Sequence, residues 1–475
     1  MKHYVNGNYE VFIFKDGTKV RMTHDDKFMP NFPESMDICI TKKCGIGCPF
    51  CYENCTKEGK HSDINKYDRF LRSLRPYTEA ALNGNDMDHP QLELLLRKLK
   101  NNNVFPNITV NQKQFVTNFE KIKAYVDEGL IYGVGVSFTH YSDELLNYLK
   151  LIPNAVLHTI VGITTMDEYH ELKDKGLKVL ILGYKRRGRG KDFVADKYES
   201  VDYNFNELRE NIGQIIKEKW FNVVSFDNLA LEQLDIQNSC NIPEDKWGEM
   251  YMGDDGQFTF YVDLVEGKFA RNSISEERYE MEDMTSEEMF KIIRRETDMN
   301  KVQVRRGIFE TNSSSTHVIS ISKDNDEFME NLPNKVHFGH GDFGWEWEVY
   351  NTLQDKANYL FTAIVDNGKS REYKPLITAI LAKHGIEAEF EETVEKQYDD
   401  GETYEEFKED RYAYVDHAHC AKDFIEGVCE NEELLMAYLF SDTSYVETGN
   451  DNEDGPDDLG AKVGAVSIAE YYKGN

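Results

Sequence analysis

Short apolar runs alternate with amphipathic segments between residues 35 and 226 of this chain. The apolar runs predict strands over Met36–Ile40, Glu79–Leu82, Ile108–Val110, Gly133–Phe138, Ala155–Val161, Val179–Gly183 and Val223–Phe226. The segments between them predict helices over Gln91–Lys100, Gln114–Glu128, Glu144–Leu151, Asp167–Lys175 and Asn206–Lys217. Parallel strands need crossover helices, so this alternation indicates an α/β core with a parallel sheet. Six or seven repeats favour a partial (β/α)6 barrel over a closed eightfold one.

Three further regions flank this core, which we place at residues 34–230. Residues 1–33 predict a β-hairpin, because two alternating runs surround the Asp16-Gly17 turn. Residues 231–297 form an extension with strand-like sequence over Tyr251–Asp263. Residues 298–475 are expected to form a separate α+β domain that opens with the strand-like stretch Val302–Ile319. Within it, the acidic stretch Glu387–Asp410 is expected to be a solvated helix face or loop.

The net charge and the distribution of apolar residues limit the partners and the location expected for this protein. The 475 residues carry a formal net charge of −31, which opposes extended nucleic-acid binding. The basic run Lys185–Lys191 still leaves room for a nucleotide-sized anion. No segment has the length of apolar sequence that a signal peptide or membrane span needs. We therefore expect a cytoplasmic protein with reduced thiols and no membrane partner.

Three cysteines follow the first predicted strand in one short loop, at Cys44, Cys48 and Cys51. Three thiolates can hold one compact iron–sulfur cubane and leave its fourth iron open for chemistry. A zinc knuckle and a purely structural cluster are the alternatives. Cys55 lies nearby and is expected to be a spectator.

The spacing Cys-x3-Cys-x2-Cys, with Phe50 before the third cysteine and Tyr52 after it, resembles the radical S-adenosylmethionine (SAM) superfamily. The resemblance implies a 4Fe–4S cluster whose open iron binds SAM. It also implies reductive cleavage of SAM to a 5′-deoxyadenosyl radical that abstracts hydrogen from a substrate. The electron would come from a reductase such as flavodoxin or ferredoxin.

Further positions match the superfamily less closely. Asn83, Gly84 and Asn85 stand where the family has Gly-Gly-Glu, which implies that they lie along the methionyl amine of SAM. The glutamate is replaced by Asn85, so charge pairing with the amine is weakened unless Asp86 provides it. The resemblance also implies cofactor contacts at three later positions. These are Ser137 near the ribose, Gly162 near the adenine, and Arg189 or Arg187 at the SAM carboxylate.

The substrate is suggested only by what accompanies the core. Met252–Ser273 resembles the hairpin of a SPASM-type extension, found in many peptide-modifying members of the superfamily. Its cluster ligands are lost, since Cys240 is the one cysteine between Cys55 and residue 298. We therefore expect a peptide or protein side chain as substrate. The alternatives are modification of a nucleobase or small molecule, and a non-catalytic iron–sulfur interaction protein.

The C-terminal region offers three candidate sites. Phe309–His317 resembles a motif of uncharacterised phage-encoded proteins and suits either a nucleophile or phosphate loop, or a loop that caps a helix. His337–Glu346 suits either a metal site or a tight turn. His417, His419, Cys420 and Cys429 have ligand types suitable for zinc, but no paired Cys-x2-Cys spacing.

Overall fold

The computed structural model divides the chain into two compact units, Met1–Asp324 and Asn325–Asn475. It describes residues 1–25, 27–83, 86–294, 302–306, 308–309, 319–322, 332–343, 348–397, 403–409, 413–415, 418–441, 444–448, 460–464 and 469–473.

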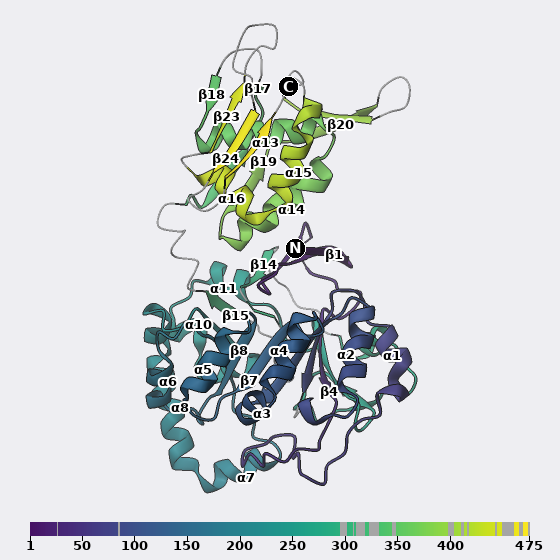
Figure 1. Ribbon diagram of the computed structural model, residues 1–475, viewed down its shortest axis with the longest axis vertical. Coiled ribbons are helices and arrows are strands. Elements are labelled where there is room, and N and C mark those ends of the chain that lie inside the picture. Colours follow the sequence, from purple (N-terminus) through teal and green to yellow (C-terminus); the bar gives the residue numbers. More distant parts are fainter. Residues whose placement is uncertain are drawn as a thin grey trace. The chain divides into compact units, whose positions relative to one another are not determined.

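An eleven-stranded sheet forms the core of the first unit (Figure 1). Its strands are, in spatial order, β13 (Tyr279–Glu280), β12 (Lys268–Ala270), β11 (Thr259–Asp263), β4 (Ser35–Cys39), β5 (Glu79–Asn83), β6 (Phe105–Asn111), β7 (Gly133–Ser137), β8 (Ala155–Ile160), β9 (Lys178–Leu182), β10 (Val223–Phe226) and β15 (Ile319–Ser322). Each neighbouring pair from β11 and β4 through to β9 and β10 is parallel. All their carboxyl ends therefore lie at one edge of the sheet, where parallel α/β proteins place their sites.

Helices connect the parallel strands and pack beside them (Figure 1). They are α1 (Asp68–Arg72), α2 (Leu92–Asn101), α3 (Gln112–Thr117), α4 (Phe119–Asp127), α5 (Asp143–Lys150), α6 (Met166–Leu172), α7 (Arg189–Asp196), α8 (Tyr198–Lys217), α9 (Asn228–Leu234), α10 (Ile236–Ser239), α11 (Glu244–Met250) and α12 (Ser286–Ile293). One face of α2 illustrates the packing, because Leu92, Leu95, Leu96 and Leu99 are its buried residues. They join one continuous core with alternate residues of the strands.

The predicted α/β class and all seven predicted core strands are confirmed, within a residue or two at most ends. The long helix predicted over Gln114–Glu128 is wrong as a single element, because it is divided between α3 and α4 at Asn118. In the described residues the sheet ends at β13 on one side and β15 on the other. The partial (β/α)6 barrel stays a prediction.

A second sheet of the first unit carries the predicted N-terminal hairpin. It contains β1 (Lys2–Asn6), β2 (Tyr9–Ile13), β3 (Lys19–Thr23) and β14 (Val302–Arg305), in that order. Strand β14 pairs antiparallel with β3, and β15 pairs antiparallel with β10. Residues beyond 298, which the sequence placed in a separate domain, therefore complete both sheets of the first unit. The compact units divide after Asp324 instead.

The second unit combines four helices with short strands. Its helices are α13 (Leu353–Asp366), α14 (Ser370–Lys383), α15 (Lys422–Glu430) and α16 (Glu432–Phe440). Its strands are β16 (Lys335–Phe338), β17 (Asp342–Phe343), β18 (Glu348–Tyr350), β19 (Glu387–Phe390), β20 (Thr393–Gln397), β21 (Thr403–Phe407), β22 (Tyr414–Val415), β23 (Tyr445–Thr448), β24 (Gly460–Gly464) and β25 (Ala469–Lys473). The acidic stretch Glu387–Asp410, expected to be a helix face or loop, contains β19, β20 and β21.

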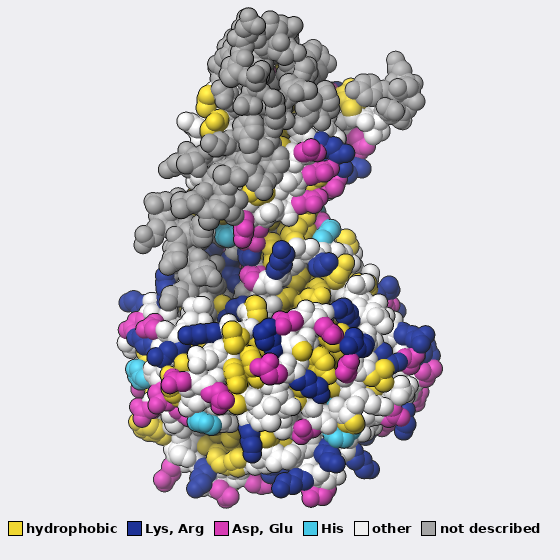
Figure 2. Space-filling view, in the orientation of Figure 1, with side chains coloured by type: hydrophobic (Ala, Val, Ile, Leu, Met, Phe, Trp, Pro, Cys, Tyr) yellow, Lys and Arg dark blue, Asp and Glu magenta, His cyan; other side chains and the backbone are white. Residues whose placement is uncertain are grey.

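Charged side chains of both signs are interspersed over the face of the first unit seen in Figure 2. Among the described residues, no helix is both long and apolar enough to cross a membrane.

Candidate functional site

The three motif cysteines lie in a loop that leaves the carboxyl end of β4. Two isolated bridges, Thr41 with His61 and Lys43 with Thr56, close the base of this loop. The backbone N–H of Cys44 donates to the Thr56 carbonyl over 2.7 Å. Because these contacts hold the base of the loop, the cysteines stay near the carboxyl edge of the sheet.

This loop and the strand ends together enclose a cavity of about 200 Å³. Cys44, Cys48, Cys51 and Cys55 line it from the loop. Each strand from β5 to β9 adds residues from its carboxyl end, namely Asn83, Thr109 and Asn111, Ser137, His158 and Ile160, and Leu182. The motif cysteines therefore open into one site with five neighbouring strands, as expected for a parallel sheet.

The predicted cofactor residues fall into three groups. Asn83 and Ser137 line the cavity, and the Asn83 amide donates to the Tyr52 hydroxyl over 3.4 Å. Gly162 and Arg189 are not among the residues that line it. Gly84 and Asn85 lie outside the described residues. The cofactor contacts at all these positions stay predictions.

Arg189 contacts the cysteine loop through three hydrogen bonds. Its guanidinium donates to the carbonyl of Cys48 over 3.1 Å and to that of Cys55 over 3.0 Å. Its backbone N–H donates to the Cys51 carbonyl over 3.1 Å. A planar guanidinium suits several acceptors at once, so Arg189 fixes the loop's backbone.

Replacement of Arg189 by Met should loosen the loop without changing any thiol. Supporting residues of a metal site typically change metal affinity by 10–100-fold. After loading with iron and sulfide, Arg189→Met should release iron to a chelator about tenfold faster than the parent protein. The exposed Arg186→Met is the matched control and should behave as the parent. Equal release rates for all three proteins would contradict this role.

Gly162 provides close packing between β8 and α8. Its φ of +77° is a conformation that side chains disfavour, and a Cβ there would lie 2.9 Å from Val201 Cγ1. The Asn204 amide also donates to the Gly162 carbonyl over 3.3 Å. The close packing of α8 therefore accounts for a glycine at position 162.

Lys185 is a cavity residue that the sequence analysis placed only within a basic run. It follows β9, lines the cavity, and lies with its Nζ 4.6 Å from the centre of the Tyr52 ring. Burial lowers the pKa of Lys185, while Asp227, Asp37 and Asp255 act in the opposite direction. The sequence does place Lys185 as the first basic residue after a predicted strand. It could not be distinguished there from its basic neighbours Arg186, Arg187 and Arg189.

Asp86 lies one turn beyond Asn83 and is fully buried. Its Oδ2 accepts a hydrogen bond from the backbone N–H of Thr109, a cavity residue, over 3.0 Å. Its Oδ1 has no hydrogen-bond partner among the residues the structure describes. Burial raises the pKa of Asp86 to about 8, against the Thr109 hydrogen bond. Asp86 is not among the residues that line the cavity, and with this pKa its carboxyl is protonated at neutral pH unless a cation beside it favours the charged form.

The pKa values of Cys51 and Cys48 are shifted in opposite directions. A hydrogen bond from the Cys55 thiol lowers the pKa of Cys51 to about 6, and Arg189 acts in the same direction. Burial raises the pKa of Cys48. Within the described residues, no group of three or more His, Cys, Asp or Glu is arranged to hold a single metal ion.

The three candidate sites predicted beyond residue 298 are only partly described. His417 and residues 310–317 lie outside the described residues, as do the side chains of His419 and Cys420. Cys429 is fully buried. His340 forms an ion pair with Glu391 at 2.7 Å. The zinc and loop hypotheses at these positions stay predictions.

No protein-family model and no curated protein match the chain. Among solved structures, the chain is similar to Streptococcus suis SuiB bound to S-adenosylmethionine, with 12% identity and a TM-score of 0.36. It is also similar to Streptococcus suis SuiB bound to precursor peptide SuiA, with 14% identity and a TM-score of 0.37. Each match covers 53% of this chain, and 64% and 63% of the SuiB chains respectively. The chain thus spans less than two thirds of these structures, and similarity this weak supports no conclusion about activity.

Proposed function

We propose that the chain is a radical SAM enzyme that holds a 4Fe–4S cluster on Cys44, Cys48 and Cys51. The observation that carries the proposal is the shared cavity, in which the motif cysteines face the carboxyl ends of β5 to β9. The donor set fits the group, because three soft thiolates suit an iron–sulfur cluster and leave one iron for a substrate ligand. When bound and reduced, the cluster would supply the electron that splits SAM into methionine and a 5′-deoxyadenosyl radical.

The protein's own groups bind and orient SAM in this proposal. Asp86 pairs with the SAM amine, in place of the family's glutamate, and Asn83 lies beside it. Lys185 supplies the positive charge for the carboxylate, since Arg189 donates to the loop backbone. Ser137 accepts or donates at the ribose. The buried, largely apolar cavity keeps water away from a reactive radical.

We further propose that the radical abstracts hydrogen from a side chain of a peptide or protein. The hairpin of β11 and β12 supports this proposal, because it extends the sheet next to β4 within the segment that resembles a peptide-modifying extension. The electron would come from a flavodoxin or ferredoxin.

The decisive test is SAM cleavage. The full chain would be loaded with iron and sulfide without oxygen, reduced, and assayed for 5′-deoxyadenosine, with an unreduced sample as the control. Formation of 5′-deoxyadenosine only after reduction is the expected result. A loaded, reduced cluster that neither binds nor cleaves SAM would contradict the proposal and favour a non-catalytic cluster protein.

Asp86→Asn should raise the stability of the apo protein while it lowers SAM affinity. The folded-state pKa of about 8 exceeds the unfolded value of about 3.9, so the unfolded chain releases its proton at lower pH. Asp86 therefore costs the parent protein stability progressively between pH about 4 and about 8. The asparagine variant should lack this fall in the free energy of unfolding, measured by urea titration at several pH values.

The same variant should bind SAM about tenfold more weakly at pH 8, as expected when a charge-assisted hydrogen bond is lost. Equilibrium binding of SAM to the loaded protein measures this change. Asp88→Asn, two residues away on the exposed side, is the matched control. Unchanged SAM affinity in Asp86→Asn would show that the amine is held elsewhere.

A further inference from the structure

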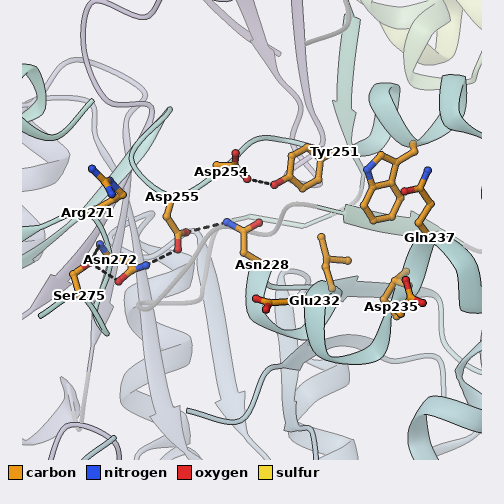
Figure 3. A pocket seen from close by; sticks show the side chains of 13 residues that line it. Asn228, Glu232, Asp235, Gln237, Tyr251, Asp254, Asp255, Arg271, Asn272 and Ser275 are labelled. Carbon is orange, nitrogen blue, oxygen red and sulfur yellow. Dashed lines mark hydrogen bonds between the residues drawn. The ribbon is translucent and has the colours of Figure 1, made fainter. Parts of the chain in front are cut away.

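A second cavity of about 580 Å³ lies in the first unit, within the segment that follows β10 (Figure 3). Helices α9, α10 and α11 form part of its wall, and the loops before β11 and after β12 form the rest. Its volume falls within the range of roughly 300–1,000 Å³ typical of ligand sites. The proposed SAM chemistry does not use this pocket.

The pocket wall is built around the half-buried carboxylate of Asp255. Asp255 accepts hydrogen bonds from the amides of Asn228 over 2.9 Å and Asn272 over 2.7 Å (Figure 3). Arg271 enters from the strand side, and its aliphatic part lies against the backbone of Gly256, where a Cβ would be 2.7 Å from Arg271 Cγ. The positive φ of Gly256, +83°, permits this approach.

Two polar atoms of this wall lack partners. Asn228 Oδ1 and Arg271 Nε are both buried, and neither has a hydrogen-bond partner among the residues that the structure describes. Buried polar atoms are nearly always paired in folded proteins. A ligand with one donor and one acceptor, such as a peptide group, would satisfy both.

The net negative charge of the pocket favours a cationic ligand. Its lining includes four carboxylates and one guanidinium, a formal charge of −3. Glu232 and Asp235 lie on one side, and Asp254 and Tyr251 on the other (Figure 3). The side chain of Glu232 is exposed, and it forms no hydrogen bond or ion pair with the side chains that the structure describes.

Aromatic side chains narrow the choice of cation. Trp247 and Tyr251 both line the pocket, with nearly parallel rings 14° apart and centroids separated by 5.8 Å. A guanidinium stacks on such faces and also matches carboxylates with its planar fork, whereas an ammonium does neither as well.

The pocket and the cysteine-lined cavity have no lining residue in common, but hydrogen bonds connect residues beside them. Lys185, a cavity residue, is attracted by Asp255, and its Nζ lies 3.4 Å from the Ser273 hydroxyl next to Asn272. Asp227 accepts from the N–H of Gly183, another cavity residue, and precedes Asn228 of the pocket. These contacts link the segments that carry the pocket to the carboxyl end of β9, which lines the cysteine-lined cavity.

We propose that this pocket holds an arginine side chain of the peptide substrate and so positions a neighbouring residue at the cysteine-lined cavity. The inference rests on the proposed function, because it names the substrate of the same site. The arginine lies between Glu232 and the aromatic side chains, and the peptide backbone pairs with Arg271 and Asn228.

Two degenerate nine-residue peptide pools test this recognition. One has a central arginine, and the other has citrulline, which keeps the shape and removes the charge. Binding of the fluorescein-labelled pools to the loaded full chain would be measured by anisotropy at 150 mM salt. The arginine pool should bind at least tenfold more tightly than the citrulline pool. Glu232→Gln and Asp255→Asn should each reduce this preference several-fold, and the exposed Glu210→Gln on α8 should leave it as in the parent.

Each outcome separates this inference from the proposed function. Equal affinity for the two pools would overturn the arginine site, even if the parent protein cleaves SAM. A preference that survives in Glu232→Gln and Asp255→Asn would overturn it too, because the charge recognition would then lie elsewhere. An arginine preference that both variants lose, in a protein that fails to cleave SAM, would support the pocket and overturn the radical SAM function.

Discussion

Single replacements of Cys44, Cys48 and Cys51 by Ala should each reduce 5′-deoxyadenosine formation to the level of a protein-free blank. All three thiols line the same cavity, and a cubane that loses one of its three protein ligands would be held by only two. Iron content and the visible absorbance of the loaded cluster would be measured alongside activity. Both should fall in every single variant.

Two other cysteines provide controls for this experiment. Cys55→Ala removes the fourth thiol that lines the cavity, and Cys240→Ala removes one beyond β10. Both variants should retain the cluster, and Cys240→Ala should retain full activity. Loss of the cluster in Cys55→Ala would show that Cys55 is a ligand, and that the assignment of three cysteines is wrong.

The second large effect concerns stability and comes from ion pairs beneath the sheet. Glu79, at the start of β5, is fully buried and pairs with Lys19 at 2.7 Å and with Arg305 at 2.9 Å through both carboxylate oxygens. Glu34 pairs with Lys19 at 3.2 Å and with Arg21 at 2.8 Å. These five residues link β3, β14 and the beginnings of β4 and β5.

Glu79→Ala should lower the free energy of unfolding of the first unit by about 3–5 kcal/mol, because buried Arg305 loses its carboxylate and buried Lys19 loses one of two. Hydrogen exchange of peptides covering β3 and β5, followed by mass spectrometry, would measure this loss. Glu93→Ala, in an exposed pair with Arg97, is the matched control and should cost less than about 1 kcal/mol. Similar effects for the two variants would show that the buried network contributes little.

The same network predicts sensitivity to acid. Burial alone would raise the pKa of Glu34, but Arg21 and Lys19 outweigh burial and lower the pKa. The stabilisation by Glu34 is therefore present above the unfolded pKa of about 4.3 and is lost as the pH falls below it. The parent protein should lose protection in β3 in that range.

Local patterns predicted the elements of the core well, because a buried parallel strand is a short apolar run whatever its neighbours are. The break at Asn118 was missed because apolar residues continue across it from Phe115 to Ile122. The pairing of β14 with β3 was missed for a different reason. It joins residues about 280 positions apart in the sequence. The alternation of apolar and polar residues in either strand does not indicate which other strand it pairs with.

Residues of the site could be predicted from the sequence only where they belong to a recognisable motif. The cysteine spacing pointed to Cys44, Cys48 and Cys51, and the resemblance to the radical SAM superfamily pointed to Asn83 and Ser137 as cofactor contacts. All five line the cavity. Arg189 and Lys185 could not be told apart in a basic run, because which of them meets a cavity depends on the turn after β9. The pocket around Asp255 left no local signal, since its residues come from four separate stretches.

Strands β14 and β15 determine where the chain can be truncated without exposing strand edges. A protein that ended at residue 297 would lack both, and the outer edges of β3 and β10 would expose unpaired backbone groups. Bare strand edges recruit other chains, so such a fragment should self-associate and precipitate during purification. Expression of the first unit alone would therefore have to extend through Asp324, because the second compact unit begins only at Asn325.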